Sequence, residues 1–437
     1  MATREPVESE GGLRASISLL RRHGDFRRLY LASLISLGGD WFLIVALFGL
    51  VIELTGQAVA VALTIAAQDL TYFVASPFAG ILADRLDRRR LMVAADLARA
   101  GLVLGFLLVR SEEAVPILYL LLAGIAVFSA VFEPAATAAM PNLVEDRDLS
   151  TANALSGSAW GTMLAVGAGL GGIVSAAFGR ETAIIIDSFS FVISALLILR
   201  IRASFSEARV ERKHASVRED TVETVRYAKK DHRVLALLGV KFGWGMAGGV
   251  LVVIPLLAHE TFDAGDVGLG LLMAARGVGA LVGPFAGRAM LGPQDRRMFL
   301  AISFSLATFG VGYVLVGFAP TLLFVAPLVT FAHLGGGATW TLSGYGLQRI
   351  VPDRIRGRIF AVDGMLVTLT FGISSILTGV LADAFTARAA AVVMGGIAVI
   401  WALAWSWLTS DVRRATMLEG CGPAPELELL APEPQAS

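Results

Sequence analysis

The chain has 437 residues, of which 56% are hydrophobic and 16% charged, and its formal net charge is zero. Soluble domains carry roughly 25% charged residues, so this composition, with a mean hydropathy of +0.71, excludes an ordinary soluble protein. A neutral chain offers no overall basic field for nucleic acid. The single cysteine, Cys421, excludes a disulfide framework and cysteine-based metal sites.

The apolar residues form long blocks, which predict an all-α membrane protein. Blocks of about 20 apolar residues are typical of membrane-spanning helices, and backbone groups in lipid must bond one another, which favours helices. The first block is too long for a signal-peptide core, so we expect it to be retained. The twelve predicted spans cover residues 29–53, 58–83, 91–109, 116–139, 152–178, 182–199, 234–259, 267–287, 298–319, 321–347, 359–385 and 389–409.

The lysines and arginines predict the orientation of these spans. If the N-terminus lies inside, the outside loops hold only Arg110, Arg180 and Arg388 of the 36 basic residues. Apart from a few within spans, the others lie on the side of the N-terminus. This bias predicts a multi-pass protein of the cell membrane with both termini in the cytoplasm.

One long charged segment, residues 200–233, divides the spans into two sets of six. We therefore expect a cytoplasmic N-terminus (1–28), two six-helix bundles (29–199 and 234–410) joined by a cytoplasmic linker (200–233), and a disordered cytoplasmic tail (411–437) that is rich in Pro, Glu and Ala. The end of the linker, residues 221–233, has the composition of a short surface helix.

The two halves also repeat short motifs. A Gly80-Ile-Leu-Ala-Asp84-Arg85 turn ends the second span, and a similar turn from Gly283 to Arg288 ends the eighth. Parallel six-helix repeats place a substrate site between the halves, near the bilayer midplane. The alternative, chance similarity of two short basic turns, explains the arginines but not their equivalent positions.

The first turn continues to Arg90 and carries the most specific pattern in the chain. Its glycine permits close helix contact, and its aspartate can lie against a helix N-terminus or an arginine. The arginines suit an anionic membrane surface. This stretch resembles the signature loop of the major facilitator superfamily, although Asp87 stands where that family usually has glycine and Gly287 replaces the aspartate in the second copy.

The resemblance implies two six-helix bundles of the major facilitator fold and a conformational latch. The residues that match the latch are Gly80, Asp84, Arg85, Arg88 and Arg89. Asp96 and Arg99 lie three residues apart on one helix face, so we expect them to form a structural pair or to join the latch.

Two further stretches narrow the resemblance: Pro141-Asn-Leu-Val-Glu-Asp-Arg-Asp-Leu-Ser-Thr-Ala-Asn153 and Gln348-Arg-Ile-Val-Pro-Asp-Arg-Ile-Arg-Gly357-Arg358. Together they are similar to the enterobactin-exporter and macrolide-efflux branch, also called transmembrane secretion effectors. This resemblance implies proton-coupled export of lipophilic or siderophore-like molecules.

The fifth span is rich in glycine and resembles the antiporter motif of drug exporters, with Ala168 where proline is typical. The matching residues are Gly167, Gly169, Gly171 and Gly172. Small residues also let helices approach closely, so ordinary packing is the alternative interpretation.

Ionisable residues near the bilayer centre are costly, so each requires a reason. Asp40 and Asp69 lie about 16–18 Å deep in the first and second spans. Arg276 and His333 lie at similar depth in the eighth and tenth. These four are the candidates for proton or substrate coupling, with structural hydrogen bonds, a salt bridge or packing as the alternatives.

Other charges receive structural interpretations. Asp187 and Lys241 are expected close to the membrane interfaces, and Asp363 near the start of a helix, where a carboxylate suits the helix dipole. Four aromatic residues beside the candidates are expected to line an apolar cavity, or alternatively to pack between helices: Trp41, Tyr72, Trp244 and Trp340.

The leading hypothesis is therefore a secondary transporter that exports small molecules by proton antiport. A nutrient importer and a non-transporting receptor remain alternatives. We predict no enzyme, because no nucleophile–base set can be assembled, and no nucleotide-driven pump, because no phosphate-binding loop occurs. The expected partners are a small-molecule substrate, protons and the lipid bilayer, with no metal, no cofactor, no nucleic acid and a monomeric state.

Overall fold

The computed structural model describes residues 12–203, 205, 224 and 226–421, and the side chains at 12–13, 80–81, 83–85, 146 and 353–354 lie outside that description. Within this part of the chain, twelve helices are long and apolar enough to cross a membrane, which confirms the predicted span number. The spans are formed by α2 (Gly24–Thr55), α3 (Ala58–Arg85), α4 (Arg88–Gly105), α5 (Val115–Ala139), α6 (Leu149–Phe178), α7 (Arg180–Leu199), α9 (His232–Met246) with α10 (Val250–Leu256), α11 (Gly265–Met290), α12 (Met298–Gly317), α13 (Leu322–Ile350), α14 (Asp353–Ala384) and α15 (Ala387–Leu408).

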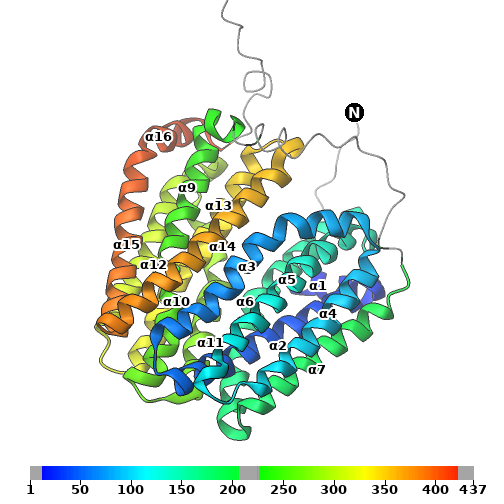
Figure 1. The fold of residues 1–437 in the computed structure, drawn as a ribbon. Coiled ribbons are helices and arrows are strands. Elements are labelled where there is room, and N and C mark those ends of the chain that lie inside the picture. The colour runs from blue at the N-terminus through cyan, green and yellow to red at the C-terminus, as the bar shows by residue number, and fades with distance from the viewer. Residues whose placement is uncertain (1–11, 204, 206–223, 225, 422–437) are drawn as a thin grey trace, which may run out of the picture.

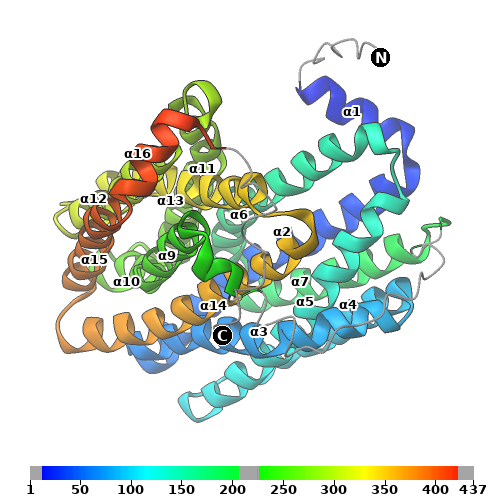
Figure 2. The ribbon, with the colours of Figure 1, turned by 90° about the horizontal axis from the view of Figure 1, so that it is seen from above.

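The spans group into two bundles, as the fold prediction requires. Helices α2–α7 form the amino-terminal bundle and α9–α15 the carboxy-terminal bundle (Figures 1 and 2). The bundles meet along two helix pairs, because α3 packs against α14 and α6 packs against α11. These pairs join the second span to the eleventh and the fifth to the eighth, so the contact between the bundles repeats the symmetry of the sequence.

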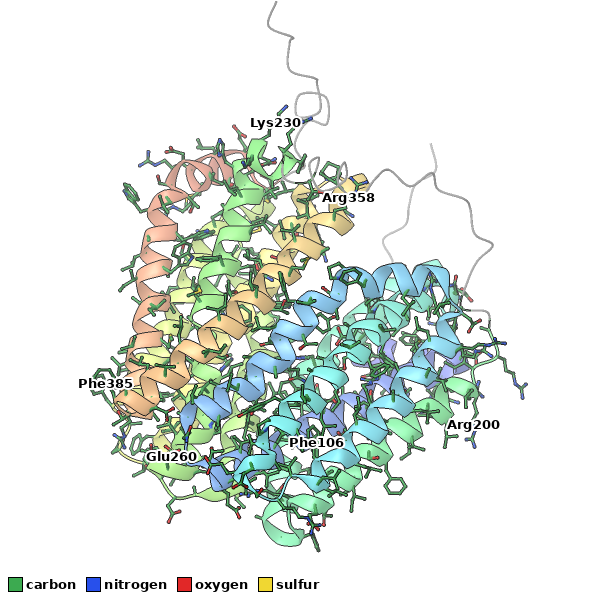
Figure 3. All side chains as sticks on the ribbon, viewed as in Figure 1. Phe106, Arg200, Lys230, Glu260, Arg358 and Phe385 are labelled. Carbon is green, nitrogen blue, oxygen red and sulfur yellow. The ribbon has the colours of Figure 1, made fainter. Side chains whose placement is uncertain are left out.

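The molecule has two distinct ends. Helix α16 (Ser410–Glu419), Lys230 and Arg358 lie at one end, which we call the terminal face (Figures 1 and 3). Glu260 and Phe385 lie at the other end, the opposite face. Figure 1 shows the ribbons of the two bundles diverging toward the terminal face and approaching each other toward the opposite face.

A short amphipathic helix, α1 (Gly12–Arg22), precedes the first span and contacts α6. Arg22 Nη2 donates to Asp148 Oδ1 at 3.0 Å, and His23 Nε2 lies 2.9 Å from Asp148 Oδ2. The hydrogen bond from His23, followed by that from Arg22, lowers the pKa of Asp148. A carboxylate at the start of α6 thus holds the amino-terminal segment against the bundle.

The tail begins as a helix, contrary to the expected disorder from residue 411. Helix α16 (Ser410–Glu419) contacts α12 and α15, and the N–H of Cys421 donates to Gln294 O at 3.2 Å. Residues 422–437 lie outside the described part. Of the predicted surface helix at 221–233, residues 226–230 are helical, and 206–223 and 225 are not described.

The seventh span is broken, a feature that the sequence analysis did not foresee. Between α9 and α10 the chain leaves the helix at Ala247–Gly249, and a π-helical turn (Leu257–Thr261) ends the span. Ser374 of α14 replaces the lost helix bonds, since its Oγ donates to Met246 O at 2.6 Å and accepts from Gly249 N at 2.8 Å. A side chain of Gly249 would collide with α14, so this close approach requires glycine.

Candidate functional site

Four carboxylates gather in the amino-terminal bundle, two of them buried, one half-buried and one exposed. They are Asp40 on α2, Asp96 on α4, Glu133 on α5 and Asp187 on α7, and we call them the acidic cluster. Asp96 and Asp187 are 0% exposed. The charge of Arg99, on α4, acts on all four. One cation therefore faces four acids from four helices.

Arg99 is held at the centre of this cluster by several contacts. It forms an ion pair with Asp96, and Nη1 donates to Ser129 Oγ at 3.4 Å. Its guanidinium lies 4.6 Å from the ring centroid of Phe132 and 4.4 Å from that of Phe191. Such contacts stabilise a cation that water does not reach. The structure thus places Asp96 and Arg99 with the acidic cluster.

The acids of the cluster differ in their partners. Tyr72 donates its hydroxyl to Glu133 Oε2 at 2.6 Å, and Ser190 donates to Asp187 Oδ1 at 3.2 Å. Asp40 has no hydrogen-bonded or ion-paired partner among the described residues. Its negative charge interacts electrostatically with that of Asp187. The buried oxygens Asp96 Oδ2 and Asp187 Oδ2 also lack a partner there. The two buried acids are therefore only partly compensated, which is unusual for buried carboxylates.

A second group of charges lies between the bundles. Arg276 on α11 is 8% exposed, and its guanidinium lies 5.3 Å from the ring centroid of Trp41 on α2 and 5.5 Å from that of Trp160 on α6. The two tryptophan rings lie edge to face, 5.4 Å apart. Asp69 on α3 is the carboxylate whose field reaches Arg276, but the two form no ion pair. Arg276 and Asp69 thus lie on different bundles, and their charges interact without forming an ion pair.

A third group lies inside the carboxy-terminal bundle. Lys241 Nζ lies 3.1 Å from Asp363 Oδ2 and 3.5 Å from the ring centroid of Trp340. Trp244 packs against Trp340 with centroids 5.5 Å apart. In the same bundle His333 Nε2 lies 2.9 Å from the hydroxyl of Tyr313. Of the four predicted cavity aromatics, the structure therefore brings Trp244 and Trp340 together and places Trp41 and Tyr72 beside different charged groups.

Two expectations about surroundings were wrong. Asp187 and Lys241 were expected to reach the membrane interfaces, yet their side chains are buried inside the bundles, 0% and 1% exposed. Asp363 was expected near a helix start, yet it lies ten residues into α14 and pairs with Lys241. Distance along a span does not say which face a residue occupies, so these partners follow only from the packing of the helices.

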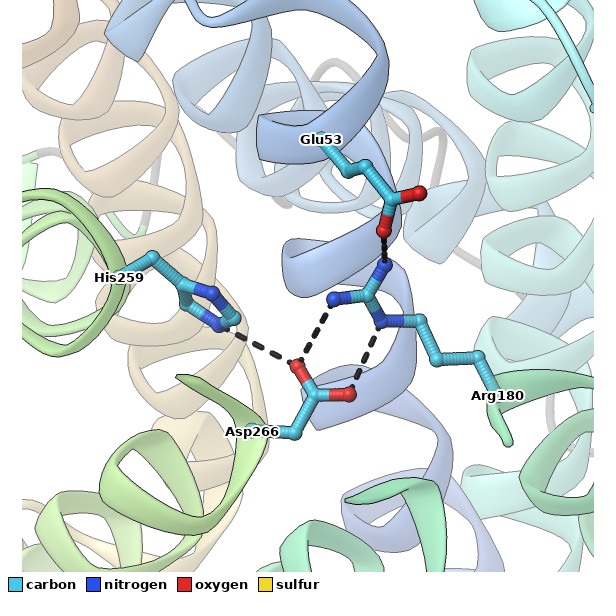
Figure 4. Close-up of polar contacts among 4 residues, drawn as sticks. All are labelled: Glu53, Arg180, His259 and Asp266. Atoms are coloured by element: carbon cyan, nitrogen blue, oxygen red, sulfur yellow. Dashed lines mark hydrogen bonds and ion pairs between the residues drawn. The ribbon is translucent and has the colours of Figure 1, made fainter. Parts of the chain in front are cut away.

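A network of ion pairs ties the bundles together at the opposite face (Figure 4). Arg180, at the start of α7, binds both carboxylate oxygens of Asp266 on α11, with Nε–Oδ2 at 2.9 Å and Nη2–Oδ1 at 3.1 Å. Arg180 also pairs with Glu53 at the end of α2, and His259 Nε2 lies 3.3 Å from Asp266 Oδ1. We call these four residues the Arg180 network. Its central pair crosses from one bundle to the other.

A second tie lies on the same face. Asp383, near the end of α14, accepts from the N–H groups of Ala58 and Val59 at 2.6 and 2.9 Å. These donors open α3, where a carboxylate satisfies free N–H groups and suits the helix dipole. The Arg180–Asp266 pair and the hydrogen bonds to Asp383 thus join the two bundles at the opposite face.

The latch residues at the terminal face are described only in part. The side chains of Gly80, Asp84 and Arg85 lie outside the described residues. Arg88 Nη1 donates to Ala138 O at 3.1 Å and to Phe205 O at 2.9 Å. Arg89 Nη2 donates to Ala203 O at 2.7 Å. Both arginines therefore fasten the start of α4 within the amino-terminal bundle.

The glycines of α6 serve two contacts. A Cβ on Gly167 or Gly171 would lie 2.7 or 2.5 Å from a backbone oxygen of α2. On the other side, a Cβ on Gly172 would lie 2.5 Å from Asp266 O and 2.8 Å from Gly270 Cα of α11, and Gly169 lies near Ala274. Helix α6 thus packs against its own bundle through Gly167 and Gly171 and against the other bundle through Gly169 and Gly172.

Comparisons with known proteins agree with this architecture. A sequence model of the family described as transmembrane secretion effectors matches residues 16–419. The multidrug efflux pump Tap of Mycolicibacterium fortuitum is 26% identical over 83% of this chain and 90% of its own length. Macrolide efflux protein A of Streptococcus pyogenes is 24% identical over 82% of this chain and 89% of its own length.

Solved structures show the same fold at low identity. A bacterial homologue of the human lysosomal transporter Spinster, in an inward-facing and unoccupied conformation, matches with a TM-score of 0.71 and 14% identity, over 92% of this chain and 99% of that chain. A transporter of the POT family matches with a TM-score of 0.71 and 11% identity, over 89% of this chain and 96% of that chain. With its family match over nearly the whole membrane part, this chain belongs to the transmembrane secretion effectors, a family of major facilitator transporters.

Proposed function

We propose that this protein exports small lipophilic or siderophore-like molecules across the cell membrane in exchange for protons, by alternating access to a site between the two bundles. The observation that carries the proton exchange is the acidic cluster, with four carboxylates around one arginine. The names of the two efflux relatives support the direction of transport.

The charge of the acidic cluster supports a role in proton binding. If all four acids were ionised, three negative charges would stay uncompensated, including that of the fully buried Asp187. Burying an unpaired charge costs several kcal/mol, so acids in this position take up protons when the site is closed to water. Asp40 is the member best suited to exchange them, because no partner among the described residues fixes its ionisation state.

The orientation completes the proposal. Lys230 and Arg358, which belong to predicted inside segments, lie at the terminal face (Figure 3), which we therefore assign to the cytoplasm, with both termini. The ties at the opposite face then close the outer side, and the described form corresponds to one that admits substrate from the cytoplasm. The inward-facing Spinster homologue supports this assignment by its fold.

Inverted membrane vesicles from cells that express the full chain test the proposal. Ethidium and radiolabelled erythromycin are the probes, and an acid-inside pH gradient is imposed and then collapsed with nigericin. We expect the gradient to drive accumulation of at least one probe above the level in vesicles that lack the protein, and nigericin to release it.

Two results would count against the proposal in different ways. Accumulation that ignores nigericin would remove proton exchange and leave export intact. No accumulation of either probe, both of which are cations, under any gradient would remove the export of lipophilic cations.

A further inference from the structure

The strongest unexplained feature outside the acidic cluster is the cation of Arg276. It is 8% exposed, and among the described residues its Nη1 has a single hydrogen-bond acceptor, the thioether Sδ of Met273 at 3.9 Å. Its Nε has no hydrogen-bond partner among the described residues. A buried guanidinium normally has a carboxylate or several acceptors, so a charge left in this state points to a missing anion.

The surroundings of Arg276 are arranged for an aromatic ligand. Trp41 and Trp160 present ring faces to the guanidinium and come from two helices of the other bundle. Trp160 is 43% exposed, so the group is not sealed, and the buried Trp41 Nε1 also lacks a hydrogen-bond partner in the described structure. One unpaired cation and one unpaired donor thus lie beside two aromatic surfaces.

The depth of the site argues against a lipid headgroup as its ligand. Arg276 lies eleven residues from the start of α11, which is about 16 Å along the helix axis. Phospholipid headgroups stay at the bilayer surfaces, so the anion must be one that enters the protein interior. A small molecule that carries both a carboxylate and an aromatic or apolar body fits this depth.

We propose that Arg276, Trp41 and Trp160 form a binding site for amphiphilic organic anions, with the carboxylate of the substrate on Arg276 and its aromatic body between the tryptophans. This inference rests on the proposed function for its transport role and names the substrate class of that transporter. In the protein without ligand, the negative charge of Asp69 acts on Arg276 from a distance. The carboxylate of a bound ligand then takes over as the counter-charge of Arg276. Because Arg276 belongs to α11 and the two tryptophans to α2 and α6, a bound ligand would contact both bundles.

Equilibrium binding to the purified full chain in detergent tests this site without any vesicle or gradient. Naphthoate, naphthamide and naphthylmethylamine share one ring system and differ in charge. We expect naphthoate to bind at least about tenfold more tightly than the other two, as a charge-assisted, bidentate contact requires. Arg276→Gln should remove this preference, and Arg276→Lys should keep part of it.

Two further variants supply a control and an independent test. Arg388 also lies over an aromatic ring, that of Phe262 at 5.3 Å, and Arg388→Gln is the matched control that should leave naphthoate binding unchanged. Asp69→Asn removes a competing negative charge, so it should tighten naphthoate binding and leave naphthamide unaffected, even if Arg276→Gln fails to fold.

The proposal is overturned if naphthoate does not bind, if it binds no better than naphthamide, or if its preference survives in folded Arg276→Gln protein. An unchanged naphthoate affinity in Asp69→Asn would also overturn it. None of these binding results bears on proton-driven export, which the vesicle assay measures separately. Conversely, vesicles that export nothing leave the binding result standing.

Discussion

Individual ionisable residues in this protein differ chiefly in whether a partner fixes their charge. Lys241 and Asp363 neutralise each other at 3.1 Å, and Arg99 is held by Asp96 and two aromatic rings. Asp40 lies in the same membrane interior without such a partner. A paired charge stabilises one structure, whereas an unpaired acid can change its protonation when water reaches it. This contrast separates structural charges from candidates for coupling.

Asp40→Asn should abolish gradient-driven accumulation of the vesicle probes. The amide cannot carry a proton, and because Asp40 has no hydrogen bond to lose among the described residues, the melting temperature should stay within about 4 °C of the wild type. Asp263→Asn is the control, since Asp263 is exposed and its φ of 48° is one that asparagine tolerates. Gradient-driven accumulation that persists in Asp40→Asn vesicles would clear Asp40 of this role.

The sequence located single residues well and their partners poorly. The apolar context of Asp40, Asp69 and Arg276 was sufficient to place them deep in spans. It did not place Glu133 and Asp187 beside Asp40, because those residues come from other helices and meet only after packing. Trp160 was missed as a partner of Arg276 for the same reason.

Among the helices, α6 carries the contact between the bundles on its smallest residues. Gly172 allows the backbone of α11 to approach at Asp266 and Gly270, close to the Arg180 network. Gly157, also on α6, has no atom within 4 Å of where a Cβ would lie. One helix thus offers a packed glycine and an open glycine for comparison.

Gly172→Ala should weaken the contact between α6 and α11. The added methyl group would lie 2.5 Å from Asp266 O, so backbone atoms must move, at a cost of about 1–3 kcal/mol. Spin labels on cysteines at Glu112 and Phe318, in a chain whose Cys421 is serine, would report the distance between the bundles at the opposite face. We expect longer distances in Gly172→Ala and none of this change in Gly157→Ala. Equal distances in the two variants would argue against a packing role for Gly172.

The docking of α16 predicts an unreactive thiol. Cys421 is 2% exposed, and burial raises its pKa to about 11. Because the thiolate is the reacting form, the folded protein should react with maleimide at pH 7 far more slowly than a free cysteine, whose pKa is about 8.5. Raising the pH toward 9 should accelerate labelling of unfolded chain well before that of folded chain. Rapid labelling of the folded protein at pH 7 would mean that α16 is not docked.

The spans were predictable because each apolar block must satisfy its own backbone in lipid. The exceptions have local causes. The helix of the first span, α2, begins at Gly24 rather than residue 29, because charged residues at the membrane surface can extend a helix beyond the apolar block. The break at Ala247–Gly249 depends on Ser374 of α14, and the helix at Ser410–Glu419 depends on α12 and α15, so neither is visible from the local sequence.

At the scale of the whole molecule, polar ties join the two bundles at the opposite face. They are the Arg180 network and Asp383, and the ribbons of the bundles diverge toward the terminal face (Figure 1). Alternating access requires that such ties break when the other end closes. Their combined strength therefore helps to set the balance between the two forms, and weakening one tie should shift that balance without unfolding either bundle.

Arg180→Ala provides the clearest test, because Arg110 offers a matched control on the same face. Arg180 is 21% exposed and pairs across the bundles with Asp266, which is 7% exposed, so its loss should cost the closed form about 1–3 kcal/mol. Arg110 and Glu181 are 75% and 69% exposed and belong to one bundle, so Arg110→Ala should cost about 0–1 kcal/mol and leave the balance unchanged. Both variants remove one positive charge from the same face, so a general charge effect would alter them equally. With the labels at Glu112 and Phe318, Arg180→Ala should enrich the longer distance about tenfold, which corresponds to 1.4 kcal/mol. If both variants shifted the distances alike, the Arg180 network would not be the tie that closes this face.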